Sequence, residues 1–260
     1  MNKTKIEWCD SSWNPVTGCL HGCEYCYARG IAQRFGGSTE TCPNDGLHEL
    51  VYPFYADTSG IKDGASRLRP YPWMFDPTLH RYRLDEPQSI EKPRTIFVCS
   101  MADIFGEWVP EYWIKAVFDA CAAAPQHRYL FLTKNPKRYI ELAKMGLLPE
   151  RENMWYGSTS TTPDDVFWWS NSHNAFVSVE PILAPFNSHP AEQVKVDWII
   201  IGAETGKRKG KVTPKREWID DLVISAALFG VPVFMKDSLV PIMGEENMLR
   251  EFPWEREMGK

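Results

Sequence analysis

Residues 197–204 read DWIIIGAE, an apolar run that ends in Gly-Ala-Glu. The three isoleucines do not alternate with polar residues, so both faces of the strand that they predict should be covered, as in a parallel sheet flanked by helices. Comparable runs of β-branched and aromatic residues recur at 94–100, 128–133, 153–159, 174–180 and 231–237, and a shorter early strand is predicted near 13–17. The pattern indicates an α/β fold.

Helical patterns lie between these runs. Residues 109–124 repeat apolar side chains at three- and four-residue steps, with Pro110 suited to the first turn. In 213–230, Thr213 is a plausible N-cap, Pro214 suits the first helical position and Gly230 suits the C-terminal stop. Shorter helices are predicted near 136–144 and 163–171, and another after Cys26. Six or seven β/α units follow, in a barrel or an open sheet with helices outside.

The long segment 37–93 interrupts this rhythm. It is rich in Gly, Pro, Tyr and Arg, and a connection of this length usually has its own structure or serves as a lid. We predict a single domain over 1–260, with 37–93 as an insertion or lid.

The composition narrows the class of protein. Hydrophobic residues make up 43% and charged residues 24%, as in a soluble globular enzyme rather than a disordered chain. The N-terminus lacks the apolar run of a signal peptide and no stretch is long enough for a membrane span, so a cytoplasmic location without membrane association is expected. The net charge of -5 gives no global attraction to nucleic acid.

Three of the seven cysteines are packed into the stretch NPVTGCLHGCEYCYARG, residues 14–30. Cys19, Cys23 and Cys26 are spaced C-x3-C-x2-C, and in a reducing compartment such a cluster indicates metal binding or catalysis rather than disulfides. A structural zinc site needs four ligands; His21 is awkwardly placed inside the loop, and Cys42 is the better fourth candidate. Alternatively, three thiolates hold a [4Fe-4S] cluster and leave one iron open to a non-protein ligand.

The spacing C-x3-C-x2-C, with the aromatic Tyr25 before the last cysteine, resembles the radical S-adenosylmethionine (SAM) superfamily. The resemblance implies a partial or near-complete (β/α)6-7 TIM-like barrel with a long insertion after the first helix. It also implies a [4Fe-4S] cluster on Cys19, Cys23 and Cys26, and SAM as cosubstrate. A reduced cluster would cleave SAM to a 5′-deoxyadenosyl radical, which abstracts hydrogen from a substrate. An electron donor such as flavodoxin or ferredoxin would be required.

Longer motifs resemble an uncharacterised family encoded by phages and prophages, which is placed near the radical SAM enzymes. They are TKIEW, WNPVTGC, CYARG, SMADIF, FLTKNPKR, VSVEPIL and WIIIGAETG. That family usually has Thr where Cys9 stands, so Cys9 receives no role. Its first two cysteines are often further apart than in this chain, which has the superfamily's spacing.

The resemblance also suggests SAM contacts at the strand ends. Ser100 and Asp103 match the segment that meets the SAM amino group, although Asp103 would equally well cap the next helix. Ser158, with Thr159, fits ribose or carboxylate contacts or an ordinary turn. Glu180 follows another strand and suits the ribose diol, and Glu204 has a similar position. Gly202 would let adenine approach the backbone closely. Lys134 and Lys236 also end strands, where each would bind an anion or pair with a carboxylate.

The substrate is not identified by these motifs. The insertion's RLRPYPW and HRYRL stretches favour nucleic acid or a nucleotide, through stacking and phosphate contacts. The alternative function is a non-catalytic, metal-stabilised nucleic-acid-binding protein. The KRKGK run at 207–211 is interpreted as a solvated loop that could also contact phosphate.

Overall fold

The computed structural model describes residues 1–36, 46–56, 67–186 and 196–256. Two compact units result: the first comprises residues 1–4 and 9–129, and the second comprises residues 5–8 and 130–260. Each unit is considered by itself below. No helix in the described ranges has both the length and the apolar character needed to cross a membrane.

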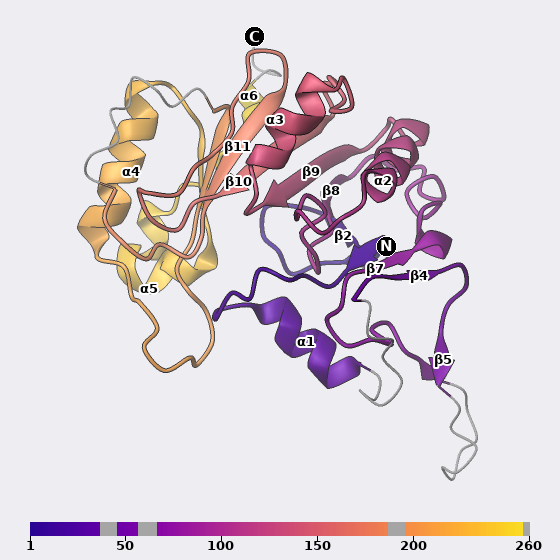
Figure 1. Cartoon of the computed structure of the whole chain (residues 1–260). Helices are drawn as coiled ribbons and strands as arrows, with labels where there is room; N and C mark the ends of the chain where they lie inside the picture. Colours follow the sequence, from indigo (N-terminus) through magenta and orange to yellow (C-terminus); the bar gives the residue numbers. More distant parts are fainter. Residues whose placement is uncertain (37–45, 57–66, 187–195, 257–260) are drawn as a thin grey trace. The chain divides into compact units, whose positions relative to one another are not determined.

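The first unit combines a parallel strand pair with two small sheets (Figure 1). Strand β2 pairs in parallel with β8 and in antiparallel with β1, whereas β7 joins β3 and β4, and β5 pairs with β6. The strands are β1 (Asn2–Lys3), β2 (Ser11–Trp13), β3 (Val16–Thr17), β4 (His48–Leu50), β5 (Tyr55–Ala56), β6 (Arg67–Leu68), β7 (Thr78–His80) and β8 (Thr95–Val98). The helices are α1 (Tyr27–Phe35), η2 (Arg81–Arg83) and α2 (Glu111–Ala123).

The predicted insertion therefore has structure of its own. Its described residues contribute β4 to β7 and η2, and β7 pairs with β3, the strand immediately before the cysteine loop. Of the insertion, 37–45 and 57–66 lie outside the described residues, and Cys42 is among them.

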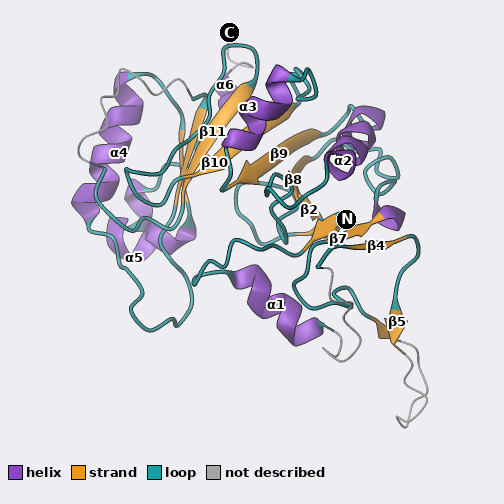
Figure 2. Ribbon diagram, in the orientation of Figure 1, coloured by secondary structure: helices purple, strands orange, loops and turns teal. Residues whose placement is uncertain are grey.

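The second unit is built on parallel strands in the order β9-β10-β11-β12-β13. They are β9 (Arg128–Thr133, which enters this unit at Leu130), β10 (Met154–Thr159), β11 (Asn174–Val179), β12 (Trp198–Ile201) and β13 (Val233–Met235). The helices are α3 (Lys137–Lys144), α4 (Arg216–Leu228), η4 (Asp237–Leu239), α5 (Val240–Met243), η5 (Glu245–Asn247) and α6 (Pro253–Arg256). Figure 2 shows α4 alongside these strands.

The core follows from the apolar runs. All residues of β12 are buried, as are those of β10, so neither strand shows the alternation of a half-exposed sheet. Trp8 comes from the short N-terminal piece of the second unit and packs against Phe176 and Trp198, with ring centroids 6.4 and 6.3 Å apart. Aromatic packing of this kind explains much of the chain's tryptophan content.

The prediction of a partial or near-complete (β/α)6-7 barrel is wrong. β1 is antiparallel, and β10 connects to β11 through residues 160–173 without a helix. The described residues between β11 and β12 contain no helix either. The chain is a mixed α/β protein in which helices do not follow each parallel strand.

The helix predicted at 163–171 fails for a local reason. The Asp165 carboxylate accepts hydrogen bonds from the backbone N–H groups of Thr161 and Thr162, at 2.6 and 3.0 Å, and from the Thr161 hydroxyl. The N–H of Trp168 donates to the Ser158 hydroxyl at 3.0 Å. The Asp165 contacts close a turn at the start of the segment, and the Trp168 N–H bonds to a side chain in place of a helical carbonyl, which is how Ser competes with helix formation.

The other predicted helices are present with shifted starts. α2 begins at Glu111 and has Pro110 as its N-cap residue, and α3 closely matches the predicted range. α4 starts at Arg216 after the N-cap residue Lys215, so Thr213 and Pro214 lie outside it. Gly230 does adopt the left-handed conformation after this helix, with φ of 67°.

Candidate functional site

The cysteine cluster lies on the loop between β3 and α1. Gly18 opens the loop with φ of 88°, and a Cβ atom there would lie only 2.1 Å from the carbonyl oxygen of Asp76. Cys26 ends the loop as the N-cap residue of α1, and its backbone N–H donates to the carbonyl of Cys23 at 3.3 Å. A close backbone approach that only glycine permits therefore fixes one end of the loop, and a helix N-terminus fixes the other.

The three thiols of the loop are half-buried and form no disulfide. The N–H of Arg29 donates to the Sγ atom of Cys26 at 3.4 Å, where the helix N-terminus favours negative charge. Burial, with smaller contributions from negative charge on Asp103, Cys23 and Cys26, raises the pKa of the Cys19 thiol to about 12. Cys19 thus lies within electrostatic reach of the other two cysteines, and its thiol resists ionisation without a compensating cation.

The chemistry of this donor set fits a thiolate-bound metal centre. Positive charge from a metal would offset the mutual repulsion of three thiolates, which explains why such sites bind metal and release protons together. Within the described ranges, no three His, Cys, Asp or Glu side chains already stand as a metal-binding group. Binding would therefore have to draw Cys19, Cys23 and Cys26 together. Cys42, the alternative zinc ligand, lies outside the described residues.

The structure brings the cysteine loop and the predicted segment at Ser100 together within the first unit. Gly18 donates its N–H to the carbonyl of Met101 at 2.9 Å. The Tyr27 hydroxyl, in the first turn of α1, donates to the carbonyl of Ser100 at 2.7 Å. The side chain of Asn14 accepts from the Ser100 hydroxyl at 3.2 Å and from the Met101 N–H at 2.9 Å.

Packing beneath the loop supports the same arrangement. Ala28 and Ala32 on the buried face of α1 form one cluster with Phe75 and Met101, and Cys19, Cys26 and Tyr71 pack against it. Tyr25, predicted to lie beside a cofactor, is half-buried. The residue after β8, Cys99, has φ of 59°, which directs the chain into this cluster.

Asp103 is already engaged in this structure. One carboxylate oxygen lies 2.7 Å from Nε2 of His21, and the other accepts from the N–H of Phe105 at 3.0 Å. The second contact stabilises a turn rather than a helix cap, because α2 begins only at Glu111. His21, which sequence reasoning set aside, thus ties the cysteine loop to Asp103, and its ring packs edge-on against Trp108.

The predicted residues of the second unit divide into separate environments. Ser158 is fully buried, and its hydroxyl accepts from Trp168. Glu180 forms an ion pair with Lys236, whose Nζ also lies 4.0 Å from Glu7. A Cβ atom at Gly202 would lie 3.1 Å from Cδ of Lys236 and 3.2 Å from Cδ of Glu180, so this glycine leaves room for the ion pair.

Glu204 belongs to a different contact. Its side chain is 3% exposed and receives two hydrogen bonds from the guanidinium of Arg208, at 2.7 and 2.8 Å. Arg208 and the N–H of Val212 lower the pKa of this carboxyl. Glu204 is therefore committed to Arg208 and does not lie with Glu180, Gly202 and Lys236 as an open ligand group.

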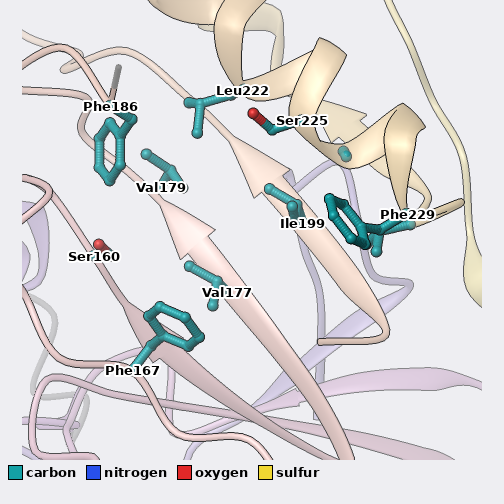
Figure 3. A pocket seen from close by; sticks show the side chains of 11 residues that line it. Ser160, Phe167, Val177, Val179, Phe186, Ile199, Leu222, Ser225 and Phe229 are labelled. Carbon is teal, nitrogen blue, oxygen red and sulfur yellow. The ribbon is translucent and has the colours of Figure 1, made fainter. Parts of the chain in front are cut away.

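A small apolar cavity lies elsewhere in the second unit. It has a volume of about 60 Å³ between α4 and the strand face that carries Val177, Val179 and Ile199 (Figure 3). The hydroxyls of Ser160 and Ser225 are among the few polar groups on its walls. Glu180 follows the end of β11 and does not line the cavity. The predicted polar residues do not line this cavity.

Three of the four arginines in the insertion's RLRPYPW and HRYRL stretches contact other parts of the first unit, and the fourth, Arg67, is exposed. Arg69 donates to the carbonyl of Gly36 at 3.2 Å, Arg81 pairs with Glu49 at 2.7 Å, and Arg83 donates to the carbonyl of Asn14 at 3.0 Å. Trp73 of the same stretch stacks on His48, with ring centroids 4.3 Å apart. These contacts weaken the reason for placing a nucleic acid there.

Sequence reasoning missed the residues that connect the site. Asn14, His21 and Tyr27 hold the loop through contacts 73 to 87 positions away in the chain, and only the neighbouring cysteines singled out their region. A search of the curated proteins found no match, and neither did a search of the solved structures. A family model described as protein of unknown function (DUF5131) matches residues 3–240. The chain belongs to this DUF5131 family.

Proposed function

We propose that the chain is a radical SAM enzyme that holds a [4Fe-4S] cluster on Cys19, Cys23 and Cys26. One observation carries the proposal: three free, half-buried thiols stand on a loop fixed by Gly18 at its start and by the α1 N-terminus at its end. The missing fourth thiolate suits a site in which a small molecule completes the coordination. A reducing cytoplasm, which we propose as the location, keeps such thiols available.

When bound, a reduced cluster with SAM supplies the 5′-deoxyadenosyl radical that takes a hydrogen atom from a substrate. The chain's own residues hold the loop for this purpose. Asn14 and Tyr27 fix the backbone at Ser100 beside the loop, and the Arg29 N–H stabilises negative charge on Cys26. We take nucleic acid or a nucleotide as the first substrate class to test, and flavodoxin or ferredoxin as the electron donor.

Asp103 acts indirectly in this proposal. Because it contacts His21 and Phe105, a SAM amino group would have to share its carboxylate or displace His21. Its effect on ligand binding therefore includes the orientation of the loop that carries His21. Glu180, the predicted ribose contact, belongs to the second unit, where its side chain is 26% exposed despite the ion pair with Lys236.

Metal content tests the cluster assignment. After anaerobic reconstitution with iron and sulfide, we expect about four irons per chain. Cys23→Ala should lose this iron, whereas Cys9→Ala should keep it, because Cys9 is another half-buried cysteine but lies outside the motif. Equal iron in both variants would contradict the ligand assignment, and a single zinc ion would favour the non-catalytic, metal-stabilised nucleic-acid-binding protein.

The activity is tested separately on the reconstituted protein. Reduction with dithionite in the presence of SAM should release 5′-deoxyadenosine, and Cys23→Ala should abolish this release. A protein that holds the iron and binds SAM, but forms no 5′-deoxyadenosine with DNA, RNA or nucleotides present, would refute the proposed chemistry on this substrate class.

A further inference from the structure

The loop that follows β12 carries an unusual concentration of positive charge. Residues 202–215 contain five basic residues and a single acidic one, although the whole chain has a net charge of -5. Lys207, Lys209 and Lys211 are exposed, and none of them forms an ion pair with a described residue. Their charge is therefore available to a partner.

The loop is held in a defined shape. The buried carboxylate of Glu204 receives both hydrogen bonds of the Arg208 fork and the N–H of Val212. The N–H of Lys211 donates to the carbonyl of Arg208 at 3.3 Å, which closes a turn with Gly210 at φ of 80°. At the base of the loop, Ala203 donates its N–H to the Ser238 hydroxyl at 2.9 Å.

This arrangement separates the two kinds of basic residue. Arg208 turns inward and neutralises Glu204, whereas the lysines on either side of it and at the turn remain in solvent. A preorganised loop loses less conformational entropy on binding than a flexible one would. The three lysines alternate along residues 207–211, at and beside one turn, and such a spacing suits contacts to successive phosphates.

We propose that Lys207, Lys209 and Lys211 form a contact site for the phosphate backbone of a nucleic acid. The segment 202–215 contains no aromatic residue, so it offers no platform for stacking bases. Lysine is a strongly hydrated point charge that binds phosphate without the planar fork used for base edges. The contact is therefore independent of base sequence.

The inference names the substrate class of the proposed enzyme and rests on the proposed function for that link alone. Binding at this loop requires neither iron nor SAM. The experiment can therefore be done on the full chain with and without reconstitution, so that a failure of cluster chemistry and a failure of nucleic-acid binding are told apart.

The test measures the anisotropy of fluorescein-labelled oligonucleotides of about 16 nucleotides, as single-stranded RNA and as duplex DNA. The triple variant K207Q/K209Q/K211Q should bind about 10- to 100-fold more weakly at about 0.1 M salt. In a plot of the logarithm of the binding constant against the logarithm of salt concentration, the slope of the variant should be smaller in magnitude than that of the wild type by about 2 to 3. Each lost phosphate contact lowers the magnitude of this slope by about 0.7 to 0.9. Two oligonucleotides of different base sequence should bind equally.

The control variant K92Q/K137Q/K144Q removes the same charge from other exposed positions. If it weakens binding as much as the loop variant does, general electrostatics accounts for the effect and the site is refuted. An unchanged affinity in the loop variant would also refute it. Stronger competition by polyglutamate or by tripolyphosphate than by unlabelled nucleic acid would assign the lysines to another anion and overturn the proposal.

Circular dichroism and iron content of the loop variant complete the test. The lysines are exposed, so both should match the wild type. A variant that binds iron and cleaves SAM normally, yet has lost nucleic-acid affinity, supports the site directly.

Discussion

Gly18 and Gly22 provide a matched test of the cysteine loop. Both have positive φ, 88° and 72°, so alanine at either position enters a conformation that costs an L-residue about 1 to 2 kcal/mol. Their surroundings differ: a Cβ atom at Gly18 would lie 2.1 Å from the carbonyl oxygen of Asp76, whereas nothing lies within 4 Å of one at Gly22.

The difference in free energy can be worked from this geometry. The clash at Gly18 involves backbone atoms, so the chain must shift, and overpacking of this kind adds about 1 to 3 kcal/mol. Gly22→Ala should therefore cost about 1 to 2 kcal/mol and Gly18→Ala about 2 to 5 kcal/mol. In a chain of this size, each kcal/mol of lost stability lowers the unfolding temperature by about 2 to 4 °C. Gly18→Ala should therefore unfold at a clearly lower temperature than Gly22→Ala.

Differential scanning calorimetry of the two variants and the wild type measures this prediction. Iron content after reconstitution supplies a second readout, and we expect Gly18→Ala to lose more of it because Gly18 anchors the loop to Met101. Equal transition temperatures for the two variants would refute the close approach to Asp76 on which the reasoning depends.

Two further predictions concern buried charge. Arg208→Met should lower the unfolding free energy by about 2 to 3 kcal/mol in urea denaturation, because the buried Glu204 carboxylate loses both hydrogen bonds from the guanidinium. The control Arg216→Met removes an exposed ion pair with Asp220 and should lower it by less than about 0.5 kcal/mol. Equal losses in the two variants would contradict the burial of Glu204. His80 is buried beside Thr17, and burial, with a smaller effect of Arg83, lowers its pKa to about 3. The folded state favours the neutral form of His80, so its contribution to stability is complete above about pH 6.5. Below that pH the contribution falls toward pH 3 by at most about 1.4 kcal/mol per pH unit. A His80→Gln variant whose unfolding free energy has the same slope against pH as that of the wild type would rule this out.

Strand positions were predictable from the sequence because they depend on local composition. The runs at 128–133 and 174–180 correspond to β9 and β11 within a residue, since buried parallel strands need continuous apolar side chains. The absence of a helix at 163–171 was not predictable from periodicity, because the Trp168 N–H that a helix would use is taken by the Ser158 hydroxyl. Counting it as a helix contributed to the mistaken barrel.

In the candidate site, too, local features could be predicted from the sequence and long-range contacts could not. Cys19, Cys23 and Cys26 were identified by spacing alone, because ligands on one short loop are recognisable without a fold. The structure brings the segment at Ser100 next to the cysteine loop through Tyr27 and Gly18, and the contact of Ser100 with SAM stays a prediction. The engagement of Asp103 by His21 depends on a contact across 82 positions, which no local pattern encodes.

By itself, the sequence determined the thiol cluster, the α/β character and most strand positions, all of which follow from residues close together in the chain. Only the tertiary structure decided which charges remain available. It paired Arg81 with Glu49 and Arg208 with Glu204, and it left Lys207, Lys209 and Lys211 in solvent. The physical reason is that a charged side chain is neutralised by whichever partner folding brings within a few ångströms, and that partner is not specified by its neighbours in sequence.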